Sequence, residues 1–149
     1  MAEFFELTVY CKNKFFKNCR VDLSEIVEIS KAATFDIVDH GEYSAYTFNF
    51  ESFIFTKENF ENTLDMFSKI TKHIFDKLDN VLFLSGIYEL TGYYTIGINK
   101  IKELDDILIK FPLLFFRQGE EKGFDVYKSV NEISVIYNKK AQDLFVDLL

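Results

Sequence analysis

An alternation of apolar and polar residues opens the chain and predicts a β-strand over residues 3–11. One face of this strand carries apolar side chains, namely Phe5, Leu7, Val9 and Cys11. The other face carries Glu6, Thr8 and Tyr10, so we expect the strand to be only half-buried. Similar segments bounded by turn residues predict further strands at 34–39, 43–55, 81–97 (one or two strands), 113–118, 124–130 and 133–137.

A different period, with apolar residues three or four positions apart, marks residues 57–78 as the clearest helix. Its apolar stripe consists of Phe60, Leu64, Phe67, Ile70, Ile74 and Leu78. Shorter stretches with helical spacing predict helices at 23–32, at 100–110 before Pro112, and after Asn138. These shorter helices rest on fewer turns than the helix at 57–78.

Consecutive predicted strands favour antiparallel pairing, and the apolar stripes need a sheet to cover them. We therefore predict an α+β fold, mainly an antiparallel sheet with three to four helices packed on it. Residues 118–123 are expected to form a hairpin loop, and Asn131-Glu132 a tight turn. No linker, repeat or change in composition divides the chain, so residues 1–149 are expected to form a single domain.

Patterns that carry catalysis or metal binding are missing from the sequence. The two histidines, His40 and His73, lie in a polar turn and near a helix end, and neither CxxC nor HExxH occurs. No G-x-S-x-G segment and no glycine-rich phosphate loop is present. Adjacent acids such as Asp105 and Asp106 point apart in regular structure and suit a solvated surface. We predict no catalytic residue, no metal site and no cofactor, and hence no enzyme.

The two cysteines, Cys11 and Cys19, are too few for a disulfide framework, and we expect both to be reduced. The first residues contain glutamates rather than the basic region of a signal peptide. The apolar runs are far shorter than the roughly 20 residues that span a bilayer. We predict a cytoplasmic protein that does not bind membranes.

The net charge of −7 is unevenly distributed along the chain. Residues 22–65 contain ten acids against only Lys31 and Lys57. A field of this sign repels phosphate backbones and attracts basic surfaces. The bases around Phe15-Phe16 have no supporting motif, so we predict a basic protein partner and no nucleic-acid binding.

Two kinds of residue are candidates for contact with such a partner. Exposed tyrosines provide contact area at a low entropic cost, and acids provide charge complementarity. The acidic candidates are Asp36, Asp39, Glu42, Glu51, Glu120 and Glu121. The candidate anchors are Tyr43, Tyr93 and Tyr94.

A small, acidic, aromatic-rich α+β domain without catalytic motifs resembles the bacterial immunity proteins of contact-dependent growth-inhibition and other polymorphic toxin systems. The resemblance covers the whole chain in character and assigns no individual residue. It implies an inhibitor that binds and neutralises a cognate toxin domain, a nuclease being the leading case. Two alternatives stay open: an enzyme or ligand-binding domain whose site is assembled from scattered residues, and an acidic nucleic-acid mimic of a phage or mobile element. A homodimer also stays open.

Overall fold

Seven strands and one helix make up the part of the chain that the computed structural model describes, residues 4–12, 34–39, 43–51, 58–77, 81–88, 108 and 111–138. In chain order these elements are β1 (Phe4–Lys12), β2 (Thr34–Asp39), β3 (Tyr43–Glu51), α2 (Phe60–Lys77), β4 (Val81–Tyr88), β5 (Leu113–Arg117), β6 (Lys128–Val130) and β7 (Ile133–Tyr137).

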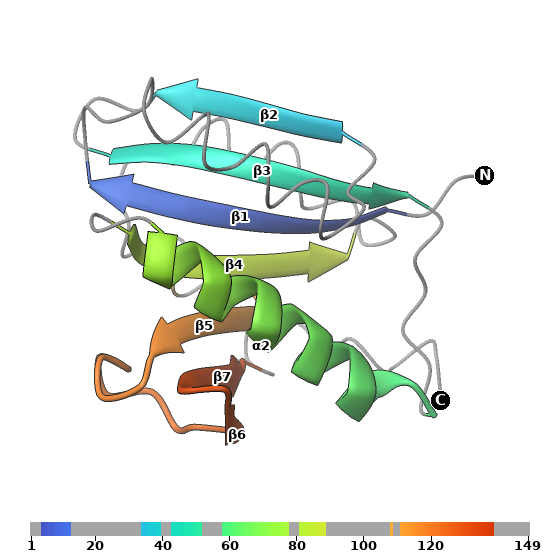
Figure 1. The fold of residues 1–149 in the computed structure, drawn as a ribbon, viewed down its shortest axis with the longest axis vertical. Coiled ribbons are helices and arrows are strands. Elements are labelled where there is room, and N and C mark those ends of the chain that lie inside the picture. The colour runs from blue at the N-terminus through green and yellow to red at the C-terminus, as the bar shows by residue number, and fades with distance from the viewer. Residues whose placement is uncertain are drawn as a thin grey trace.

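The strands form one antiparallel sheet in the order β2-β3-β1-β4-β5-β7-β6 (Figure 1). β1 lies inside the sheet, where Thr8 pairs with Thr47 of β3 on one side and with Ser85 of β4 on the other. β2 and β6 are the two outermost of these strands. The predicted antiparallel pairing is therefore confirmed.

Strand positions agree closely with the alternation in the sequence, and the strands predicted at 34–39 and 133–137 have the same bounds in the structure. The strand predicted at 124–130 is reduced to Lys128–Val130. The residues before it follow a turn at Gly123, and Tyr127 N donates a hydrogen bond of 2.7 Å to Val135 O. The ends of the strands predicted at 43–55 and 81–97 lie partly outside the described residues.

The connection 118–123 is not a hairpin loop, which corrects the prediction. It joins β5 to β6, but β7 lies between these two strands and pairs with both. The tight turn at Asn131-Glu132 is confirmed, since both residues adopt positive φ angles of 55° and 63°, as two-residue hairpins require. β7 is buried along most of its length and β6 is not, so burial favours the inner position for β7.

α2 lies across one face of the sheet, in front of its β4–β5–β7 half (Figure 1). It agrees with the helix predicted at 57–78, because its apolar stripe is buried against the strands. Arg117 of β5 contacts the last turn of α2. The Arg117 guanidinium lies 4.5 Å from the Phe75 ring centroid, and its Nη2 donates a hydrogen bond of 3.2 Å to Phe75 O. A cation that satisfies a carbonyl at a helix C-terminus is favourable for the helix dipole.

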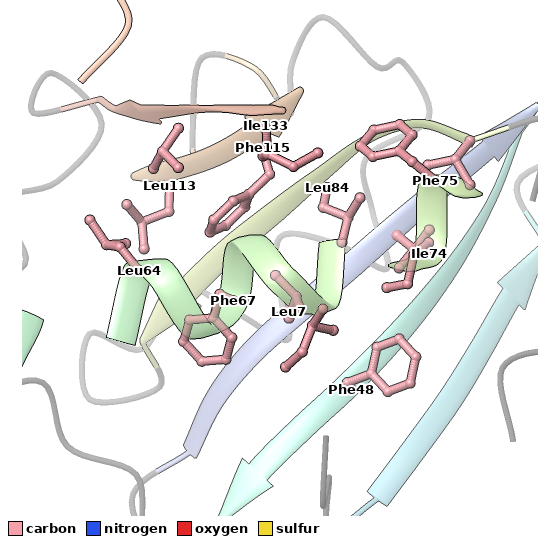
Figure 2. Close-up of a cluster of buried hydrophobic side chains, with 14 of the residues drawn as sticks. Leu7, Phe48, Leu64, Phe67, Ile74, Phe75, Leu84, Leu113, Phe115 and Ile133 are labelled. Carbon is pink, nitrogen blue, oxygen red and sulfur yellow. The ribbon is translucent and has the colours of Figure 1, made fainter. Parts of the chain in front are cut away.

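The core between α2 and the sheet is aliphatic and aromatic. Figure 2 shows the helix side chains Leu64, Phe67 and Ile74 directed toward strand residues such as Leu7 and Phe115. Leu64, Phe67, Ile74, Leu7 and Phe115 are all fully shielded from solvent. This cluster accounts for the face of β1 that the alternation predicted to be apolar.

The other face of the sheet is also buried, which corrects the prediction of a half-buried first strand. Glu6, Thr8 and Tyr10 are 6%, 1% and 0% exposed. A second cluster forms on this face, with Leu108 and Phe111 contributing to it. It consists of Tyr10, Tyr43, Ala45, Phe83, Leu108, Phe111, Leu114, Phe116 and Ile136.

The prediction of three to four helices packed on the sheet is wrong. Within the described ranges α2 is the one complete helix that packs against the sheet, and Leu108 is a single helical residue buried in the second cluster. The helices predicted at 23–32 and after Asn138 lie outside those ranges, and of 100–110 only Leu108 is described. The prediction assumed one buried sheet face that several helical stripes would share. In the structure a single long helix covers its half of one face, and the strands bury side chains on the opposite face as well.

Candidate functional site

The buried polar residues on the second sheet face are the first place to look for chemistry. Thr8 Oγ1 and Thr47 Oγ1 lie 3.1 Å apart, and Tyr10 Oη and Ser85 Oγ lie 2.7 Å apart. Burial is the main cause that raises the pKa of Tyr10, so this phenol stays protonated. These hydroxyls bond to one another across neighbouring strands, which makes the row a structural network that orders the sheet centre.

In the described part of the chain, no group of three or more His, Cys, Asp or Glu residues could hold a metal ion. Cys11 is a buried thiol, and His73 is half-buried in the last turns of α2. Cys19, His40 and the acidic pair Asp105-Asp106 lie outside the described residues.

The acids predicted to face a partner are spread over the sheet. Asp36 and Asp39 belong to the outermost strand β2, and Glu51 ends β3, where it pairs with Phe4. Glu42, Tyr93 and Tyr94 lie outside the described residues.

Tyr43 cannot serve as an exposed anchor, contrary to the prediction, because it is only 2% exposed. Its ring centroid lies 6.1 Å from that of Tyr10 in the second buried cluster. The prediction failed for the same reason as for β1. Tyr43 lies in the same buried cluster as Tyr10, on the sheet face that was expected to be exposed.

Glu120 and Glu121 are adjacent but play different roles in the 118–123 loop. Glu121 Oε2 accepts hydrogen bonds from Ser134 Oγ and from Gly119 N, both at 2.6 Å. The bond from Ser134, followed by that from Gly119, lowers the pKa of Glu121 below its usual value. Glu120 is 56% exposed and lies 3.9 Å from Arg117. Glu121 therefore holds the loop against β7, and Glu120 is the acid that a partner can reach.

Replacing Glu121 with glutamine is expected to destabilise the domain at about pH 7 and much less in acid. A lowered pKa in the folded state stabilises the fold above the usual pKa of 4.5, and this contribution is lost as the pH falls through the folded-state pKa. Urea unfolding at a series of pH values from about 7 into acid measures the difference in the free energy of unfolding between the wild type and Glu121→Gln. Glu120→Gln is the matched control. A difference that stays constant with pH would show that the carboxylate does not hold the loop.

A second charged cluster connects the first half of α2 to β6 and was not predicted. Tyr127 Oη donates to Glu61 Oε1 at 2.6 Å, and Lys128 Nζ donates to Glu61 Oε2 at 2.7 Å. Lys128 Nζ also lies 2.8 Å from Asp65 Oδ1. The bonds from Lys128 and then Tyr127 lower the pKa of Glu61, so its carboxylate stays ionised. The cluster ties the helix to the outermost strand β6.

Large apolar side chains are exposed at few places in the described residues: Met66 on α2, and Val126 and Tyr127 before β6. Val126 and Tyr127 are 43% and 45% exposed. The Tyr127 ring makes edge contacts with Phe60 and Tyr137, at centroid distances of 5.9 and 6.1 Å. The alternation of apolar residues could not reveal this arrangement, because Glu61 lies 66 positions before Tyr127 in the chain.

Comparison with family models, curated proteins and solved structures finds no match for this chain. Among the described residues, no helix combines the length and apolar character needed to cross a membrane.

Proposed function

We propose that this protein is an acidic inhibitor of the immunity type, which binds a basic toxin domain and neutralises it. The observation that carries the proposal is that the described part of the acid-rich segment 22–65 has acids at both outermost strands of the sheet. Its strand β2, with Asp36 and Asp39, is an outermost strand of the described sheet, while β1 and β4 occupy inner positions. Glu61 and Asp65, from the helical part of the segment, form ion pairs with Lys128 of β6.

The charge of the domain suits such a target. An enzyme that grips phosphate groups presents a basic cleft, and the net charge of −7 attracts a surface of that kind. Complementary charge mainly raises the association rate and excludes wrong partners, whereas apolar anchors slow dissociation. An inhibitor of an intracellular toxin would act in the cytoplasm.

Acids occur at both edges of the described sheet. One edge is β2, which contains Asp36 and Asp39, whereas Glu42 lies outside the described residues. The other is the β6 edge, where Glu61 and Asp65 form ion pairs with Lys128. A spacing of about 4.8 Å between neighbouring strands separates β2 from β6 by about 29 Å. The two edges are therefore tested with separate sets of substitutions.

The experiment begins with affinity capture of the partner from cells that naturally produce the protein, followed by purification of both proteins. Association rates are then compared for the wild type and two triple charge reversals. Asp36→Lys, Asp39→Lys and Glu42→Lys form the β2-edge variant. Glu58→Lys, Glu120→Lys and Asp125→Lys make the same change in charge at exposed acids outside β2. Each triple variant is the matched control for the other.

We expect one triple variant to slow association by at least about tenfold at low salt, because charge steering changes association rates by roughly 10- to 1,000-fold. The captured partner should lose its toxic activity in the presence of the wild-type protein. Equal rates for the wild type and both triple variants would contradict the proposal. Turnover of a small molecule by the purified domain would favour the enzyme alternative, and capture of a DNA-binding defence protein would favour the nucleic-acid mimic.

A further inference from the structure

The segment that leads into β6 combines three properties of an interface anchor. Val126 and Tyr127 are adjacent and exposed, they precede an outermost strand, and Tyr127 donates a hydrogen bond to the carboxylate of Glu61. Interfaces are enriched in tyrosine because its ring gives a large contact area with few rotatable bonds. The anchors predicted from the sequence do not include this pair, and the one that the structure describes, Tyr43, is buried.

Tyr127 is fixed in place before any partner arrives. Its ring meets those of Phe60 and Tyr137 at interplanar angles of 73° and 78°, and its hydroxyl donates to Glu61. Fixing a side chain in advance lowers the entropy that binding must remove. An exposed ring held in this way differs from a surface tyrosine that is free to change rotamer.

The charges near Tyr127 favour a cationic partner. Glu61 and Asp65 share the single ammonium group of Lys128, at 2.7 and 2.8 Å. Asp125, two positions before Tyr127, is exposed. Three carboxylates and one ammonium give this group of residues a net formal charge of −2. An arginine or lysine that stacks on a tyrosine face and approaches carboxylates gains from both contacts.

We propose that Val126 and Tyr127, with the carboxylates of Glu61, Asp65 and Asp125, form the surface that grips the basic partner. This inference rests on the proposed function and assigns the contact to the β6 edge rather than the β2 edge. Tyr127 is the apolar anchor. The carboxylates bind an arginine or lysine side chain of the partner close to the place where the partner contacts the Tyr127 ring.

The test uses the purified full-length protein and the partner captured above. Tyr127→Ala is expected to raise the dissociation rate by about 10- to 100-fold, the range of an interface hot spot, with little change in the association rate. Tyr127→Phe keeps the ring and should change dissociation by less than about fivefold. Met66→Ala removes another exposed apolar side chain, 42% exposed on α2, and should leave both rates unchanged.

Because Tyr127→Ala could also loosen the contact with α2, Val126→Asp gives a second test at an exposed position outside the hydrogen-bonded cluster. It should likewise speed dissociation, and urea midpoints confirm that each variant is folded. If Tyr127→Ala and Val126→Asp bind like the wild type while the β2-edge triple variant slows association, the inference is wrong and the proposed function stands. If no variant and no change of salt alters binding, or no partner is captured, both fail.

Discussion

Replacing Phe67 with alanine is expected to lower the free energy of unfolding by about 3–5 kcal/mol. Phe67 is fully shielded in the centre of α2 and belongs to the cluster between the helix and the sheet (Figure 2). Removing its ring loses the transfer free energy of the buried carbons and leaves a cavity that a packed sheet cannot fill by collapse.

Urea unfolding measures this loss directly. Met66→Ala, one position earlier on the exposed side of α2, is the matched control and should change stability by less than about 0.5 kcal/mol. A loss below about 1 kcal/mol for Phe67→Ala would show that α2 does not cover the sheet as described.

The second large effect is expected at Tyr10, on the opposite face of the sheet. Tyr10→Ala should destabilise by about 3–5 kcal/mol, because its ring is buried 4.7 Å from that of Phe83. Tyr10→Phe keeps the ring and removes the hydroxyl that bonds to Ser85 Oγ, so it should cost about 1–3 kcal/mol. A loss under about 1 kcal/mol for Tyr10→Ala would mean that the second face is exposed, as the alternation alone predicted.

The sequence was a good guide to local structure. Alternation located β2 and β7 to the residue, and the helical stripe through Phe67 located α2. Both patterns are read from residues that lie close together in the chain. Each pattern marks the face of the strand or helix that is buried in the folded protein. The tight turn at Asn131-Glu132 was predictable for the same local reason.

Burial of the second sheet face was not predictable, because a polar side chain in a strand does not show by itself whether it faces solvent or a buried hydrogen-bond partner. Thr8 looks like a solvent-facing residue, but it pairs its hydroxyl with Thr47, 39 positions away. A polar side chain that finds such a partner can be buried at little cost. The same limitation hid the buried position of Tyr43 and misplaced a candidate anchor.

The candidate site depends still more on distant contacts. Glu121 appeared as a partner-facing acid, but Ser134 and Gly119 engage it within the protein. Tyr127 appeared as one residue of a predicted strand, and only the folded chain brings it to Glu61. Spacing along the chain cannot separate an acid that holds a loop from an acid that meets a partner.

The salt dependence of association between the purified protein and its captured partner tests the central claim most directly. The Debye length is about 30 Å at 0.01 M salt and about 3 Å at 1 M, so attraction by an acidic surface is strong in the first condition and nearly absent in the second. An acidic inhibitor of a basic protein predicts an association rate that falls by at least about tenfold across this range. A rate that stays constant from low to high salt would contradict it.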